Sequence, residues 1–391
     1  MEIQTLAGQR HPKNTSRIQS VDILRGAIMV LMAIDHVRVY SGIPAGGPTP
    51  GIFFTRWVTH FSAPGFAFLA GTSAFLYSIR LNDPKKLARF LLTRGLLLVF
   101  LELTLIRFFW MFNFNYGDFT LAGVIWMLGW CMVILSAFVR LRSSTIGIIG
   151  LVIIFAQQIF HAIPKIFPQS LAKPVGWIWN FFYPTDLPSI PGIAILYVLI
   201  PWIGVMMAGY GFGQFLLREP KSLRKICLRI GVGAILIFLF VGISLIIFGP
   251  ANEGPLNPVF RLLAQQKYPA SQLFLLMTLG PLIAFIPWAQ NARGRIANIL
   301  QTIGKVPMFF YLLHILLIHC SALITNLIIS GVTHQEWYRS APFVEVDEAH
   351  RWTLSLLYLV YFIDLVILYY ACRWYGKYKF SQPEKIWLKY L

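Results

Sequence analysis

The segment VDILRGAIMVLMAIDHVRVY, at residues 21–40, has the length and apolarity of a membrane-spanning helix but carries five ionisable side chains. These are Asp22, Arg25, Asp35, His36 and Arg38. Ionisable groups inside a span are costly, so they mark a functional site unless they only form structural ion pairs. Arg25 and His36 are eleven residues apart, which places them about 20° apart around a helix and roughly 16 Å apart along its axis. We therefore expect both to line one channel, with Met29 and Met32 between them.

The composition is typical of a protein with many membrane spans. The 391 residues are 57% hydrophobic and 12% charged, with a mean hydropathy of +0.66, whereas a soluble domain carries about 25% charged residues. In a soluble protein the net charge of +18 would suggest nucleic acid. Here the basic residues lie between apolar segments, where they set topology and contact anionic lipid. We therefore expect a lipid bilayer around the chain and no nucleic-acid partner.

Ten segments are apolar over the length that a helical span needs, which is about twenty residues. They are 20–41, 57–79, 90–110, 119–139, 146–163, 191–215, 227–248, 271–289, 305–330 and 353–372. The polar first twenty residues lack the features of a signal peptide, so the first apolar segment should remain as the first span. We predict an all-α polytopic membrane protein with about ten transmembrane helices in one bundle.

The distribution of basic residues predicts which side each loop faces. With the N-terminus in the cytoplasm, 21 of the 33 Lys and Arg residues fall on the cytoplasmic side, 8 on the opposite side and 4 inside spans. Cytoplasmic loops carry such an excess of positive charge. We expect both termini in the cytoplasm, with a cytoplasmic segment at 1–19, a transmembrane domain at 20–372 and a cytoplasmic tail at 373–391. Proline- and aromatic-rich loops at 42–52, 164–190 and 249–270 should face outward.

The first predicted span separates two kinds of chemistry. Arg25 lies near its cytoplasmic end, where a guanidinium suits an anion such as phosphate. His36 lies toward the opposite leaflet, where an imidazole suits proton transfer or nucleophilic attack. Asp22 and Asp35 each precede an arginine by three residues, so each can pair with it on the helix surface.

Several stretches resemble known membrane acyltransferases. Arg25 and His36, with ten residues between them, match the Arg/Lys-ten-His motif of the membrane acyltransferase-3 family. The run SVDILRG at residues 20–26 is more similar to the heparan-α-glucosaminide N-acetyltransferase family and its bacterial relatives. Further similar stretches lie, in the same order, at 53–77, 124–137, 199–213, 274–283 and 304–319. The resemblance implies a transmembrane acyltransferase that uses cytoplasmic acetyl-CoA, located in the bacterial inner membrane.

The chain departs from this family at the predicted catalytic centre. The heparan-acetylating family carries Asn where this chain has His36, and its proposed catalytic histidine lies in the first outer loop. That loop, residues 42–52, contains no histidine here. His36 is therefore our first candidate for the catalytic base or nucleophile, with Asp35 as a carboxylate that tunes it. His60 is the second candidate.

The remaining candidates come from three other predicted spans. Arg56 precedes His60 at the start of the second span, although an interfacial histidine packed near Trp57 would give the same pattern. Glu102 is an intramembrane carboxylate that could pair with Arg25. Tyr311 and His314 resemble the Tyr-x-x-His of acyltransferase-3 and are candidates for substrate binding or for orienting the catalytic centre. We assign Arg25, Asp22, Arg56, Glu102, Tyr311 and His314 to substrate binding.

These residues favour transfer of an acetyl group from acetyl-CoA to a sugar or glycan on the periplasmic side. A proton-coupled permease or exporter remains the alternative, because intramembrane His, Asp and Glu also relay protons. No phosphate loop, dinucleotide fingerprint, zinc-protease motif or hydrolase elbow is present in the sequence. The four cysteines lie in apolar segments without metal-ligand spacing, so we expect no metal. The acceptor, the choice between direct transfer and an acetyl-enzyme, and the oligomeric state, a homo-oligomer included, stay open.

Overall fold

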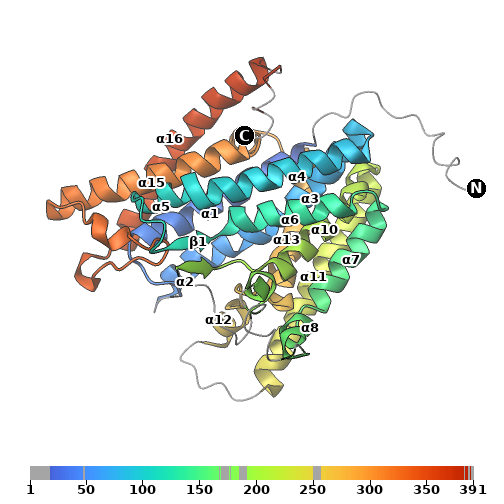
Figure 1. Cartoon of the computed structure of the whole chain (residues 1–391), viewed down its shortest axis with the longest axis horizontal. Helices are drawn as coiled ribbons and strands as arrows, with labels where there is room; N and C mark the ends of the chain where they lie inside the picture. Colours follow the sequence, from blue (N-terminus) through green and yellow to red (C-terminus); the bar gives the residue numbers. More distant parts are fainter. Residues whose placement is uncertain are drawn as a thin grey trace, which may run out of the picture.

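The computed structural model describes residues 18–46, 49–166, 178–184, 192–249 and 257–382, together with residues 168, 176, 384, 385 and 388. Residues 1–17 of the predicted segment at 1–19, most of the loop at 164–190 and part of the tail at 373–391 lie outside these ranges. In the described part the chain is a bundle of helices, and the only regular sheet there has two short strands (Figure 1).

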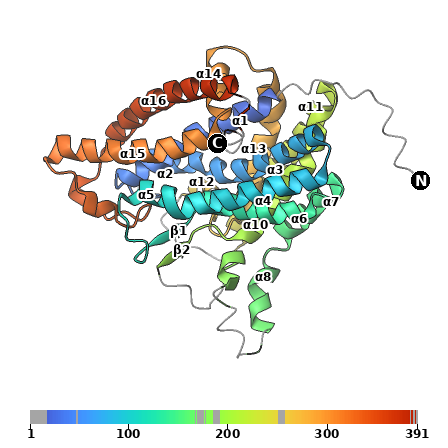
Figure 2. The ribbon, with the colours of Figure 1, turned by 45° about the horizontal axis from the view of Figure 1, so that its top comes forward.

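Helix α1 (Gln19–Tyr40) is the centre of the bundle. Most of its residues are buried, and it contacts α3, α13, α14, α15 and α16. Figure 2 shows α1 enclosed between the C-terminal helices and the helices that follow it in the chain. A helix surrounded in this way can hold charged side chains only where they are paired or face a cavity.

The helices that surround α1 follow the predicted spans closely. The longer ones are α3 (Ser62–Leu81), α4 (Pro84–Leu101), α6 (Val124–Phe138), α7 (Ser143–Phe155), α10 (Leu199–Phe212), α11 (Pro220–Phe248), α13 (Gln272–Asn291), α14 (Arg295–Gly304), α15 (Pro307–Ser330) and α16 (Leu354–Ser381). Shorter helices are α2 (Pro50–Trp57), α5 (Arg107–Met111), α8 (Ile159–Ala162) and α12 (Pro258–Leu263). Between α4 and α5 the chain forms a π-helical turn at Glu102–Ile106.

Each of the ten predicted segments overlaps one of the longer helices, α1 included, whereas α14 lies between two predicted segments. Within the described residues, five helical stretches are long and apolar enough to cross a membrane: Leu199–Leu217, Pro220–Phe248, Gln272–Asn291, Pro307–Ser330 and Leu354–Ser381. The outward face of α11 is apolar and exposed, as for Phe240 at 75% and Ile247 at 63%. Such a surface is what lipid tails would cover.

Two predicted helix starts are wrong. Residues 120–122 and 193–195 were predicted as parts of spans but form β1 (Thr120–Ala122) and β2 (Ile193–Ile195), which pair in parallel. A short apolar run has no periodicity that separates a strand from a helix. Helix α16 also continues to Ser381, beyond the predicted end of the transmembrane domain at residue 372.

Glycines let the backbones of neighbouring helices touch. A Cβ at Gly304 of α14 would lie 1.8 Å from the carbonyl oxygen of Asp22, and one at Gly26 of α1 would lie 2.0 Å from that of Leu300. Because these obstacles are main-chain atoms, only glycine permits the close approach of α1 and α14. This contact fixes the end of α1 that carries Arg25.

Candidate active site

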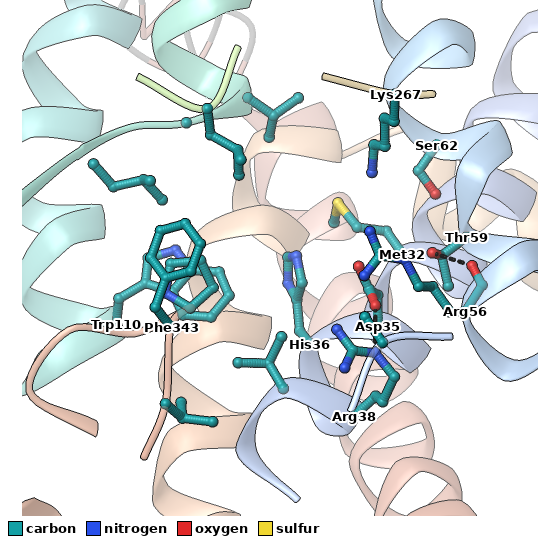
Figure 3. A pocket seen from close by; sticks show the side chains of 18 of the residues that line it. Met32, Asp35, His36, Arg38, Arg56, Thr59, Ser62, Trp110, Lys267 and Phe343 are labelled. Atoms are coloured by element: carbon teal, nitrogen blue, oxygen red, sulfur yellow. Dashed lines mark hydrogen bonds and ion pairs between the residues drawn. The ribbon is translucent and has the colours of Figure 1, made fainter. Parts of the chain in front are cut away.

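A cavity of about 630 Å³, the His36 cavity, lies beside the C-terminal half of α1. From α1 it is lined by Met32, Asp35, His36 and Arg38. Facing walls come from α2, α3, the π-turn, α5, β1, the residues just after β2, α15 and the loop before α16. Figure 3 shows His36 and Lys267 pointing into the same space, with Asp35 and Arg38 beside them.

His36 is held by a second histidine. His314 is fully buried in α15, and its Nδ1 lies 3.1 Å from the carbonyl oxygen of Phe310. A carbonyl only accepts, so this Nδ1 carries the hydrogen and His314 Nε2 accepts in the neutral ring. His36 Nδ1–H donates to that Nε2 at 2.7 Å. This relay leaves the lone pair of His36 Nε2 available for chemistry.

Trp110 fixes the other side of the His36 ring. The two ring centroids are 4.9 Å apart in an edge-on arrangement, and the Tyr40 hydroxyl donates to the Trp110 carbonyl at 2.6 Å. The rings of His36 and His314 lie edge to edge and nearly parallel, with centroids 4.9 Å apart and planes 21° apart. An imidazole confined by two rings has one orientation, which is the arrangement that proton transfer requires.

Asp35 does not orient His36. Its carboxylate accepts from Arg38 Nε at 2.8 Å, while Arg38 Nη1 also donates to the carbonyl of Ile43 at 2.6 Å. Arg56 and Lys267 lie close enough to act on the same carboxylate electrostatically. Asp35 is therefore surrounded by cations, and the hydrogen bond that orients His36 is made with His314. Tuning of His36 by the charge of Asp35 stays a prediction.

Glu102 lies on the opposite wall of the His36 cavity. It opens the π-turn, is 2% exposed, and faces the backbone N–H groups of Gly123 and Ile125. Its second oxygen has no hydrogen-bond partner among the described residues. The predicted pairing of Glu102 with Arg25 is wrong, because the two side chains line different cavities. The π-turn, which hydropathy does not reveal, directs Glu102 to its position.

A second cavity of about 560 Å³, the Arg25 cavity, lies beside the N-terminal half of α1. Five basic side chains line it, and no carboxylate does so among the described residues. These are Arg25, Arg80, Arg94, Lys305 and Lys379. The rest of its lining is largely apolar and comes from α3, α4, α6 and α15.

Arg25 is positioned by three neighbours. Its Nη2 donates to Ser73 Oγ at 2.6 Å and its Nη1 to the Gly304 carbonyl at 3.3 Å. Asp22 lies 3.6 Å away, as its spacing predicted. Asp22 thus supports Arg25 and does not line the cavity itself.

The two cavities are adjacent in the middle of the bundle. Phe66 of α3 and Tyr311 of α15 line both of them. Met29 lines the Arg25 cavity and Met32 lines the His36 cavity. The predicted face of α1 therefore lines both cavities, with Arg25 and Met29 in one and Met32 and His36 in the other.

His60 lies outside the lining of the His36 cavity. It is 7% exposed, its ring packs against Phe274 at 5.5 Å, and its Nδ1 has no hydrogen-bond partner among the described residues. Arg56, by contrast, lines the cavity. The structure thus brings together His36, Asp35, Arg56, Glu102 and Tyr311 around one space, with His314 behind His36.

Several residues of the His36 cavity were not predicted from the sequence. Trp110, Tyr197, Lys267 and Tyr268 line the His36 cavity. Lys267 falls in a predicted outer loop, and nothing in its spacing connects it to α1. In the described ranges no group of three His, Cys, Asp or Glu side chains could hold a metal ion. This finding does not test the whole chain, and the absence of a metal stays a prediction.

Comparison with known proteins identifies the family. A search among curated proteins gives no match. A family model described as heparan-alpha-glucosaminide N-acetyltransferase, catalytic, matches residues 17–249, which is more than half of the chain. The matched part contains His36, Asp35, Arg56 and Glu102, whereas Lys267, Tyr311 and His314 follow it. The match confirms the resemblance seen at SVDILRG, and the chain belongs to the heparan-alpha-glucosaminide N-acetyltransferase family.

Proposed function

We propose that the protein transfers an acetyl group from acetyl-CoA, bound in the Arg25 cavity, to a sugar or glycan acceptor in the His36 cavity. The observation that carries this proposal is the pair of adjacent cavities that share Phe66 and Tyr311 in their linings. An acetyltransferase working across a membrane needs separate entrances for its two substrates and a common point at which they react. We place the donor side in the cytoplasm and the acceptor side in the periplasm of a bacterial inner membrane.

The Arg25 cavity suits the charge of a coenzyme A thioester. Guanidinium and ammonium groups bind phosphates by charge-assisted hydrogen bonds, and five such side chains line this cavity. The apolar lining, with Met29 and Phe66, suits the thin pantetheine arm. An arm that follows α1 from Arg25 toward His36 would span roughly 16 Å, the distance set by the helix rise.

Acetyl-CoA supplies the activated acetyl group, and His36 supplies the base. His36 Nε2 takes the proton of the acceptor hydroxyl or amine as its oxygen or nitrogen attacks the thioester carbon. The carbon–sulfur bond breaks, and the proton passes from Nε2 to the departing sulfur to give free CoA. His314 accepts from His36 Nδ1 throughout and holds the ring in this tautomer. An acetyl group carried on Nε2 would need the same free nitrogen.

Substitution of His36 tests the chemistry. His36→Ala should lower acetyl transfer by about 10²–10⁴-fold, the usual contribution of a general base, as followed by release of free CoA in the presence of a glycan acceptor. His60→Ala is the matched variant, because His60 is buried beside the cavity without lining it. Normal turnover by His36→Ala, or loss of turnover only in His60→Ala, would contradict the assignment.

Binding of the donor separates the enzyme from the permease alternative. Acetyl-CoA should raise the melting temperature of the purified protein, since a ligand that binds only the folded state stabilises it. His36→Ala should keep this stabilisation, whereas Arg25→Ala should lose most of it. Lys86→Ala is the control, because Lys86 is exposed and lines neither cavity. If neither CoA nor acetyl-CoA raises the melting temperature of the wild-type protein, the permease alternative would be favoured.

A further inference from the structure

The cationic wall of the His36 cavity carries more positive charge than its own carboxylate balances. Arg38, Arg56 and Lys267 all lie near Asp35. Asp35 is engaged with Arg38 at 2.8 Å. One carboxylate against three cations leaves an excess of two positive charges on this wall, and this excess faces the space beside His36.

Arg56 and Lys267 make no ion pair within the described residues. The ammonium of Lys267 lies over the rings of Tyr197 and Tyr268, 5.8 Å and 5.2 Å from their centroids. Arg56 lies in a backbone turn, in which its carbonyl accepts from Thr59 Oγ1 at 2.7 Å. Both side chains are half-buried and line the cavity (Figure 3).

The other carboxylates of the cavity do not neutralise this wall. Glu102 lies across the cavity against the backbone of Gly123. Glu345 is exposed, and it makes no ion pair with a described residue. Arg351, also part of the lining, is already paired with Glu348 at 3.2 Å. The excess charge is therefore concentrated at Arg56 and Lys267.

We propose that the acceptor carries an anionic group, a carboxylate or a phosphate, which Arg56 and Lys267 bind together. Half-buried cations without a counter-ion are costly, and an anionic ligand removes that cost on binding. Tyr268, which also lines the cavity, offers a ring against which a sugar can pack. With its anion held there, the acceptor would present a hydroxyl or amine to His36 Nε2. This inference rests on the proposed function and names the class of its acceptor.

Titration calorimetry of the purified full-length protein with three probes tests the inference. Glucuronate and glucose 6-phosphate carry the two candidate anions, and glucose is the neutral reference. At least one anionic sugar should bind about a hundredfold tighter than glucose, as expected for charge-assisted hydrogen bonds from two cations. Arg56→Gln and Lys267→Gln should each reduce that preference by about tenfold, and the double variant should abolish it. Arg351→Gln should keep it.

Each outcome has one meaning. Preference for glucuronate alone identifies a carboxylate, and preference for the phosphate alone identifies a phosphate. Equal binding of all three sugars, no binding of any of them, or a preference that survives in the double variant would overturn the inference. Stabilisation of every variant by acetyl-CoA shows that it is folded. If the wild-type protein ignores acetyl-CoA but prefers an anionic sugar, the proposed function fails while the anion site stands.

Discussion

The hydrogen-bond relay from Phe310 through His314 to His36 determines which nitrogen of His36 is free. The Phe310 carbonyl fixes the tautomer of His314, and His314 fixes that of His36. His314 is fully buried and does not line the His36 cavity. It therefore acts through His36, as a positioning residue, and has no contact with the acceptor.

Substitution of His314 should separate positioning from packing. His314→Gln retains an oxygen that can accept from His36 Nδ1, whereas His314→Phe fills the space without an acceptor. We expect kcat to fall about 10²-fold or more in the Phe variant and to stay within about tenfold of wild type in the Gln variant, with KM little changed in both. Equal losses in the two variants would assign His314 a packing role only.

The periodicity of α1 predicted Arg25 and His36 on one face because helix geometry alone determines that relation. The pairing of Arg25 with Glu102 was wrong because partners from different helices depend on how those helices end and turn. Lys267 was missed for the same reason: it reaches the cavity from a loop more than two hundred residues after α1. Contacts within one helix can be predicted from the sequence because helix geometry determines them, whereas contacts between distant segments cannot.

Close glycine contacts join the helices that form the cavities. A Cβ at Gly209 of α10 would lie 2.1 Å from the carbonyl oxygen of Phe68, and one at Gly71 of α3 would lie 1.9 Å from that of Met206. The small residues at 65–74 have two kinds of neighbour. Gly71 packs against α10, while Ala70, Ser73 and Ala74 line the Arg25 cavity.

Gly209→Ala should destabilise the bundle, because the added methyl group meets a main-chain atom that cannot move aside. Such overpacking costs about 1–3 kcal/mol, which should appear as a lower melting temperature in detergent. Gly233→Ala is the control, since a Cβ there has no atom within 4 Å and alanine favours a helix over glycine. A drop of equal size in both variants would mean that the α3–α10 contact is not the cause.

At the scale of the helices, each predicted segment overlaps a longer helix, but hydropathy did not predict α14 or the strands β1 and β2. Both strands are short apolar runs that lead into a helix, so a window of twenty residues merges them with it. The error matters for the site, because Leu121 of β1 and Gly123, which follows it, line the His36 cavity. A hydropathy average over twenty residues does not separate elements that are shorter than its window.

Across the whole molecule, the charge distribution and the cavities agree on two sides. Three basic residues of the Arg25 cavity, Arg80, Lys305 and Lys379, come from loops or helix ends that the positive-inside rule predicts as cytoplasmic. Lys267 and Arg351 of the His36 cavity come from loops predicted to face outward. These two observations are independent, since the charge count uses no coordinates, and together they support a donor side and an acceptor side.

This sidedness predicts the labelling of single cysteines placed at exposed positions. In a variant whose four cysteines are replaced by serine or alanine, Glu348→Cys should react with a membrane-impermeant maleimide in intact cells, and Lys86→Cys only after permeabilisation. Glu348 and Lys86 are 88% and 74% exposed, so burial cannot explain a difference between them.

The loop at 80–89 precedes the third predicted span and the loop at 331–352 precedes the tenth. An odd number of spans therefore separates the two loops. Labelling of both positions from the same side would remove a span from the topology and would place both cavities on one face of the membrane.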